Sequence, residues 1–362
     1  MSTREFDVLV IGEGLAGAMA SAAAAIEGAH VALVSKGPGS FMLADDCFDL
    51  DAVDSRRLES DDGFRQELQF FLKIAAEAGC EYRGWLGEKV RVPTILGTFR
   101  DVTLAPLYFG KHDLLRLKEV VVVGFSSIPD FDANFIAERL SSKARSEHSD
   151  TVFRAHQLQI SSDELQVSLS NGPPRLELQF AAQFDRKSQF REAVIRALSS
   201  AVSNADLMIV PGVLGINTTT DELAELGRQV GCAICEVATL PPSVLGIRLF
   251  RRFEHYLAKS GVERFTGFAV SELWSEGERY RGVVLDTPGR KQRLQSSAIV
   301  IATGAFSHLF EANTSEAMPP NVFVCGGALR ASDPRSENAV AIITGYRAGM
   351  CAAIVGVQYA GR

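Results

Sequence analysis

Cysteine is scarce in this sequence, and the residues are scattered rather than grouped. The six cysteines stand at Cys47, Cys80, Cys232, Cys235, Cys325 and Cys351. So sparse a set in a chain of 362 residues excludes a disulfide framework and favours a reducing compartment. We therefore expect a cytoplasmic protein.

No stretch is typical of an export signal or of a membrane span. The opening residues, MSTREFDVLVIG, place charges directly before a short apolar run and lack a small-residue cleavage site. The longest late apolar tract, residues 339–360, is interrupted by Gly345, Arg347 and Gly349, which favours a buried helix. Any membrane contact is therefore expected to be made through a partner.

Positive charge is also in short supply. Lysine and arginine number 37 against 44 aspartates and glutamates, which gives a formal net charge of −7. Such a surface repels nucleic acid backbones, and no segment concentrates enough basic residues to offset that repulsion. We expect no nucleic acid partner.

What the sequence does contain is an opening β-strand, glycine turn and helix. Residues 6–11 are apolar and rich in β-branched side chains, GEGLAG follows at once, and an alanine-rich stretch leads to a second apolar run at 30–35. This order predicts a right-handed βαβ unit. Two further apolar runs, 297–302 and 321–325, end in TGA and GGA and are expected to complete the same sheet.

The predicted fold class is therefore α/β: a Rossmann-like FAD/NAD(P)-binding domain of the two-dinucleotide-binding flavoprotein type. The length suits two domains. We assign the dinucleotide or flavin domain to residues 1–62 and 243–362. Residues 63–242 are expected to form an inserted mixed α/β domain on the substrate or partner side.

The glycine motif predicts a nucleotide site. Gly12, Gly14 and Gly17 have the spacing G-x-G-x-x-G, in which the first glycine permits a tight turn, the second lets a pyrophosphate approach, and the third packs helix on strand. Leu15 and Ala16 open the helix, whose N-terminal N–H groups attract an anion. The alternative is a merely close-packed glycine turn.

The second strand ends without the expected ribose-binding acid. Ser35 and Lys36 stand where an aspartate or glutamate would accept ribose hydroxyls. Ser35 can hydrogen-bond a ribose and Lys36 can contact a phosphate, or Lys36 is simply solvated.

The two late strand ends supply further candidates. Thr303 and Gly304 follow one strand, and Gly326 and Gly327 follow the other. Strand ends of one parallel sheet meet at the same edge, so these residues are expected beside the first glycine loop. Together they favour a noncovalent flavin, FAD or FMN, over a nicotinamide cofactor, the alternative being ordinary strand-end glycines.

Three segments carry a family resemblance: LGTFR at 96–100, VVVVGFSSIPDFDANFIAERL at 120–140 and TLPPSVLGIRL at 239–249. The chain resembles the B subunit of anaerobic glycerol-3-phosphate dehydrogenase. The resemblance implies oxidation of sn-glycerol 3-phosphate to dihydroxyacetone phosphate, with electrons passed to quinone. It also implies a flavin, usually described as FMN, and partnership with a flavoprotein A subunit and an iron–sulfur C subunit.

The sequence departs from that family near its C-terminal end. SENAVAI, at 336–342, stands where the family is glycine-rich at the start of its last helix. This departure and the missing ribose acid favour one alternative, a non-catalytic assembly or electron-relay subunit with a degenerate flavin fold. A flavin dehydrogenase for another 2-hydroxy compound is a second alternative.

Three residues are candidates for the substrate side. Arg248 and Arg100 can grip an anionic substrate or a cofactor phosphate, because guanidinium offers paired donors to phosphate. For each the alternative is a structural ion pair. His308 follows the strand end at Gly304, where a general base for an alcohol belongs, although it can equally be a surface residue.

Cys232 and Cys235 form a C-x-x-C pair. The spacing suits a redox couple or half of a metal site. Because a zinc site needs four ligands and no second pair accompanies this one, we expect two apolar strand cysteines and no metal.

Overall fold

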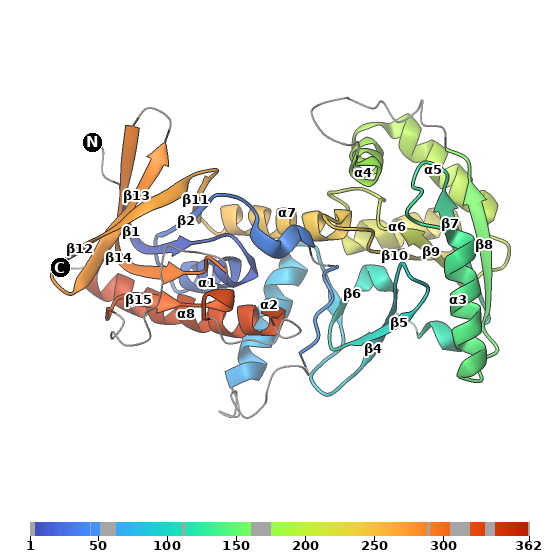
Figure 1. Ribbon diagram of the computed structural model, residues 1–362, viewed down its shortest axis with the longest axis horizontal. Helices are drawn as coiled ribbons and strands as arrows, with labels where there is room; N and C mark the ends of the chain where they lie inside the picture. The colour runs from blue at the N-terminus through green and yellow to red at the C-terminus, as the bar shows by residue number, and fades with distance from the viewer. Residues whose placement is uncertain are drawn as a thin grey trace. The chain divides into compact units, whose positions relative to one another are not determined.

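The computed structural model describes residues 4–43, 45–50, 63–110, 113–160, 175–287, 290–304, 319–329 and 337–360 (Figure 1). The chain divides into two compact units. Unit 1 comprises Met1–Phe41, Asp49–Ala78 and Phe253–Arg362, and unit 2 comprises Met42–Phe48 and Gly79–Arg252. Helix α2 (Gly63–Glu77) thus lies in unit 1, whereas we expected the inserted region to begin at residue 63.

Unit 1 is built on a seven-stranded sheet, counted over its described strands, in the order β11-β2-β1-β14-β13-β12 with β15 also paired to β14. The strands are β1 (Arg4–Ile11), β2 (Val31–Ser35), β11 (Glu263–Thr266), β12 (Ala269–Glu276), β13 (Arg279–Thr287), β14 (Arg290–Ile301) and β15 (Val322–Val324). The early and late parts of the chain therefore share one sheet.

The central strands of this sheet are parallel. Val8 of β1 is in register with Val31 of β2 and with Ala298 of β14, and Ile299 of β14 pairs with Val322 of β15. Buried side chains on both faces explain why these segments are continuous apolar runs. The prediction that the late strands complete the opening sheet is confirmed.

Helices α1 (Leu15–Ile26) and α8 (Glu337–Ala360) pack side by side in unit 1 (Figure 1). Their backbones touch: a Cβ added at Gly349 would lie 2.3 Å from the Ala20 carbonyl oxygen. Within the described chain, α8 has the length and apolar composition to cross a membrane, yet 56% of its most apolar window is buried. In this structure α8 is a core helix of unit 1.

Unit 2 contains a four-stranded parallel sheet in the order β10-β9-β7-β8, counted over its described residues, with helices packed on it. Its strands are β7 (Glu119–Phe125), β8 (Val152–Leu158), β9 (Leu207–Pro211) and β10 (Ala233–Val237), and its helices are α3 (Ala133–Ser146), α4 (Leu176–Arg186), α5 (Ser188–Ala201) and α6 (Thr220–Val230). The mixed α/β character matches what we expected of the middle region.

Short elements complete the two units. Two small antiparallel pairs in unit 2 join β3 (Tyr82–Arg83) to β6 (Ala105–Pro106) and β4 (Val90–Pro93) to β5 (Phe99–Val102). The 3-10 helices are η1 (Gly39–Leu43), η3 (Leu107–Phe109), η4 (Leu114–Arg116) and η5 (Gly326–Leu329).

Helix α7 (Val244–Lys259) follows Pro241 and Pro242 of the TLPPSVLGIRL segment. The Ser243 hydroxyl accepts a hydrogen bond of 3.0 Å from the Gly246 N–H and so caps the first turn of the helix.

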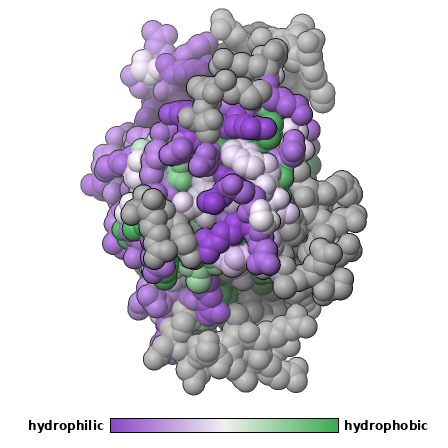
Figure 2. All heavy atoms as spheres, turned by 90° about the vertical axis from the view of Figure 1, so that its left-hand side faces the viewer, coloured by the Kyte–Doolittle hydropathy of each residue, from purple (hydrophilic) through white to green (hydrophobic). Residues whose placement is uncertain are grey.

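The surface agrees with the acidic, globular composition. The face in Figure 2 carries mostly hydrophilic side chains among its described residues, with small separate apolar areas. Isolated exposed apolar residues of this kind are ordinary for a globular protein.

Candidate functional site

The three motif glycines have three different surroundings. Gly12 turns with φ +109°, and a Cβ there would lie 2.3 Å from the Ala302 carbonyl oxygen. A Cβ on Gly17 would lie 1.8 Å from the Gly12 carbonyl oxygen, so only glycine lets α1 pack this closely on the turn. A Cβ on Gly14 would meet nothing within 4 Å. Gly14 is therefore the point where a ligand can approach the loop.

The N-terminus of α1 fits a phosphate group. Gly14 is the N-cap in an extended conformation, and among the described residues no side chain caps the helix. The first N–H groups of a helix need an acceptor from outside the helix, and the helix dipole favours an anionic one. Gly39 passes nearby, because its Cβ position lies 3.4 Å from the Gly14 Cα. The loop thus provides a glycine-walled cradle.

Both late strand ends lie at this loop. The Ala302 N–H donates a 2.8 Å hydrogen bond to the Ile11 carbonyl, which places Thr303 and the exposed Gly304 directly beyond the loop. At the end of β15, a Cβ on Gly326 would lie 2.7 Å from the Ala16 Cβ. Gly327 continues into η5. The structure therefore brings the predicted cofactor residues of three strand ends together.

At the end of β2, the structure reveals an acid that the sequence reasoning missed. The buried Ser35 hydroxyl donates a 2.7 Å hydrogen bond to Oε2 of Glu13, while Lys36 is exposed. Nε of Arg264 lies 2.5 Å from Oε1 of Glu13, and the Thr266 hydroxyl lies 3.4 Å from Oε2. One signal was available in the sequence, namely an acid inside GEGLAG.

Arg248 belongs to a buried ion pair in unit 2. Its side chain is 1% exposed, and Nη1 lies 2.6 Å from Oε2 of Glu236. Nε and Nη2 both donate to the Gly215 carbonyl oxygen, at 3.1 and 2.7 Å. Although burial works to lower it, the Glu236 carboxylate holds the pKa of Arg248 above its ordinary value. These contacts are those of the structural ion pair that the sequence left open as the alternative to phosphate binding.

The other two substrate-side candidates have different outcomes. Arg100, on β5, is 46% exposed and lies 2.7 Å from Oδ2 of Asp45. It keeps access to solvent, so its guanidinium can still meet an anion. His308 lies outside the described residues. Of the SENAVAI segment only the first residue, Ser336, lies outside them, and residues 337–342 open helix α8.

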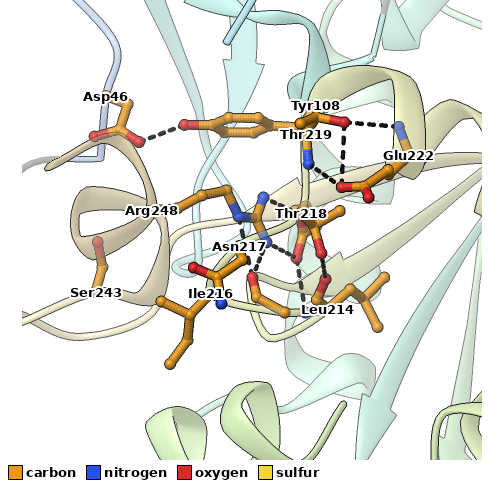
Figure 3. A network of polar contacts seen from close by, with 12 residues as sticks. Asp46, Tyr108, Leu214, Ile216, Asn217, Thr218, Thr219, Glu222, Ser243 and Arg248 are labelled. Carbon is orange, nitrogen blue, oxygen red and sulfur yellow. Dashed lines mark hydrogen bonds and ion pairs between the residues drawn. The ribbon is translucent and has the colours of Figure 1, made fainter. Parts of the chain in front are cut away.

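A second buried polar group adjoins Arg248 (Figure 3). The Tyr108 hydroxyl donates a hydrogen bond to Oδ2 of Asp46, and the Arg248 guanidinium lies 5.4 Å from the centroid of the Tyr108 ring. Asp46 is fully buried and has φ +63°, a conformation rare for residues other than glycine. Burial raises its pKa to about 8, so this acid is neutral at neutral pH. No sequence pattern singled it out.

The C-x-x-C pair is inert in this structure. Both cysteines are free and buried, and burial raises the pKa of Cys235 to about 12 and that of Cys232 to about 11. A thiol needs its thiolate form to attack a disulfide or bind a metal. Among the described residues no group of histidine, cysteine and acidic side chains is arranged to hold a metal ion.

Comparison with known proteins agrees with this geometry. A family model, the FAD binding domain, matches residues 7–45 and 248–337. The B subunit of anaerobic glycerol-3-phosphate dehydrogenase from Actinobacillus pleuropneumoniae serotype 5b is 24% identical over 327 residues, covering 83% of this chain and 75% of that protein. Its counterpart from Yersinia pestis is 24% identical over 340 residues with the same coverage.

Two longer proteins of known structure align with most of this chain. A 3-ketosteroid delta1-dehydrogenase from Sterolibacterium denitrificans has a TM-score of 0.38 and 13% identity, and 84% of this chain covers 48% of it. For an L-amino acid deaminase from Proteus vulgaris the values are 0.36 and 14%, and 87% of this chain covers 57%. This chain thus spans about half the length of each.

The FAD binding domain match and the B-subunit relatives confirm the resemblance to the B subunit, the fold class and the flavin cofactor. The FAD binding domain match includes the glycine loop, β2, the ends of β14 and β15, and the acid Glu13. The cradle at Gly14 fits the phosphate end of such a cofactor. The coarse function is that of a flavin-binding oxidoreductase.

Proposed function

We propose that this chain is a dehydrogenase subunit that oxidises sn-glycerol 3-phosphate to dihydroxyacetone phosphate, with electrons passed to quinone through partner subunits. The observation that carries the proposal is the glycine cradle at the N-terminus of α1, joined by two late strand ends, in a chain similar to the B subunit of that enzyme. The cradle is the evidence for a bound cofactor, and the similarity to the B subunit is the evidence for the substrate.

In this proposal each group of residues has a distinct task. Gly12, Gly14 and Gly17 admit the cofactor phosphate, and Thr303 and Gly304 with Gly326 and Gly327 form the adjoining wall. A bound flavin supplies the two-electron acceptor for alcohol oxidation. The chain itself orients that group and fixes its electrostatic surroundings, so the glycine loop must be free of bulk at Gly14.

The substrate carries a phosphate, and we propose Arg100 as the residue that meets it. Arg100 keeps 46% of its side chain exposed while Asp45 fixes one side of the guanidinium. An arginine can then present its remaining donors to a phosphate in a paired geometry. We propose His308 as the base that takes the proton from the substrate hydroxyl.

An absorbance spectrum tests the cofactor, and anaerobic titration with sn-glycerol 3-phosphate tests the reaction. We expect bound flavin with visible absorption bands that bleach on addition of this substrate. Gly14→Val tests where the flavin binds. A Cβ at Gly14 meets no protein atom within 4 Å, so we expect this variant to fold normally but to lose flavin. Loss of flavin in a variant that keeps the thermal midpoint of the flavin-free wild-type protein locates the cofactor at the cradle.

A second candidate function, a non-catalytic assembly or electron-relay subunit, has one observation in its favour: β2 ends in Ser35 rather than in an acid. A colourless protein that takes up neither FAD nor FMN would support that candidate against the dehydrogenase. Flavin that bleaches with another 2-hydroxy compound, and not with glycerol 3-phosphate, would change the substrate alone.

We further propose that the chain works at the inner face of the cytoplasmic membrane, bound to an A-type flavoprotein and a C-type iron–sulfur subunit. The support is the name of its relatives, each the B subunit of an anaerobic glycerol-3-phosphate dehydrogenase, and the burial of 56% of the most apolar window of α8. Affinity purification from native membranes should therefore recover a second flavoprotein or an iron–sulfur protein. Recovery of homo-oligomer alone would contradict the proposal.

A further inference from the structure

A polar network of Glu13, Ser35, Thr266 and Arg264 joins three strand ends at the glycine loop, and of these four residues only Ser35 has so far been considered for cofactor binding. Glu13 directly follows β1 in the loop, Ser35 is the last residue of β2, and Thr266 is the last residue of β11. Strands β2 and β11 are parallel neighbours, with Ser35 in register with Thr266. The Glu13 carboxylate therefore lies at the carboxyl ends of these strands, the edge where nucleotides bind in open α/β sheets.

This carboxylate is buried, and the chain compensates its charge. Glu13 is 3% exposed, Nε of Arg264 contacts its Oε1, and Nη2 of Arg264 contacts a second acid, Glu254. A buried acid without such partners costs several kcal/mol. An uncompensated negative charge in this loop would also repel a phosphate at the N-terminus of α1. Arg264 therefore lets an acid and a phosphate site share one loop.

We propose that Glu13 is the acid of the adenosine-ribose subsite for FAD, supplied by the glycine loop instead of the end of β2. In dinucleotide folds an acid at the end of the second strand accepts the ribose hydroxyl, about 20 residues after the motif. Here a serine, Ser35, ends the second strand, and the acid, Glu13, comes from the glycine loop. The Ser35 hydroxyl donates a 2.7 Å hydrogen bond to Oε2 of Glu13. The inference rests on the flavin cofactor of the proposed function.

The hydrogen bonds of Glu13 leave room for a ribose hydroxyl. Oε2 accepts a short bond from Ser35 and a long one, 3.4 Å, from the exposed Thr266. A carboxylate oxygen accepts about two hydrogen bonds. A ribose hydroxyl can replace the weak contact with Thr266 while Ser35 and Arg264 keep the carboxylate in place.

Calorimetric titration of the flavin-free protein with FAD and FMN tests the assignment, because FMN lacks the adenosine ribose. Glu13→Gln keeps the shape and removes the charge, and we expect it to weaken FAD binding about tenfold or more and to leave FMN affinity unchanged. Glu67→Gln is the matched control: Glu67 is 2% exposed and pairs with Arg347 at 2.6 Å, so the substitution also removes the charge of a buried acid paired with an arginine in unit 1. This control should leave both affinities unchanged.

Three results would overturn the inference. Equal weakening of FAD and FMN means that Glu13 acts on the phosphate site or on the fold. Unchanged or tighter FAD binding in Glu13→Gln means that the Glu13 carboxylate does not accept a hydrogen bond from the ribose. If the wild-type protein binds FAD no more tightly than FMN, the adenosine half of FAD makes no contact that favours binding, and Glu13 has no ribose to recognise. Wild-type protein that binds neither flavin contradicts the proposed function itself, which separates the two failures.

Discussion

Replacing Glu236 with alanine should lower the free energy of unfolding by about 3–5 kcal/mol, the cost of stranding a buried charge. The Arg248 guanidinium would keep its place at 1% exposure with no counterion, and the Leu214 N–H would lose the Oε1 acceptor that it contacts at 2.9 Å. Urea unfolding of the two proteins measures the difference. Flavin affinity should stay unchanged, because both partners lie in unit 2 and the glycine loop lies in unit 1.

Arg248→Lys separates the structural role from phosphate recognition. Lysine keeps the charge but loses the two donors that Arg248 gives to the Gly215 carbonyl oxygen. We expect a lower thermal midpoint with unchanged affinity for flavin and substrate. A tenfold weaker affinity with an unchanged midpoint would restore Arg248 as a phosphate ligand. Arg228→Lys, at an exposed pair with Glu225, is the control and should change neither quantity.

A double replacement with apolar residues of similar size gives an independent check. If the pair is structural, removing Arg248 and Glu236 together should cost less than removing Glu236 alone, since no buried charge remains unpaired. Strictly additive losses of stability would mean that the two side chains act separately. That result would contradict the ion pair seen at 2.6 Å.

The parts of the fold that could be predicted from the sequence are those that depend on neighbouring residues. β1, the glycine loop and α1 follow from a local apolar run and motif, and β14 and β15 from runs of the same kind. Strand β8 lacks such an apolar run: of the seven residues of VFRAHQL only Phe153 and Leu158 are buried, because β8 is an edge strand with one described neighbour, β7. Its place in the sheet depends on pairing that no local pattern contains.

The polar partners were unpredictable for the same reason. Glu13 and Arg264 are 251 residues apart in the chain, and only the closure of the sheet brings β11 beside β2. From the sequence, Arg248 was either a phosphate ligand or a member of a structural ion pair. Which partner it has, Glu236 or a ligand phosphate, is decided by the fold of unit 2 and not by the segment around Arg248.

Asp46 should make the protein less stable as the pH rises. Burial raises its pKa from 3.8 to about 8, so the native state holds a proton that the unfolded state releases above about pH 4. Unfolding then releases a proton between these two values, and the free energy of unfolding falls by up to about 1.4 kcal/mol per pH unit. The stabilisation is complete below pH 4 and lost by about pH 8.

Asp46→Asn removes this dependence while keeping a neutral acceptor for the Tyr108 hydroxyl, and asparagine also tolerates the positive φ of this position. We expect the variant to match wild type near pH 4 and to exceed it by several kcal/mol near pH 8, by urea unfolding at both values. Asp101→Asn, at an exposed acid of unit 2, should run parallel to wild type. If the stability profile of Asp46→Asn against pH also runs parallel to that of wild type, Asp46 is ionised in the native state. Tyr108 and Arg248 would then stabilise the charged carboxylate.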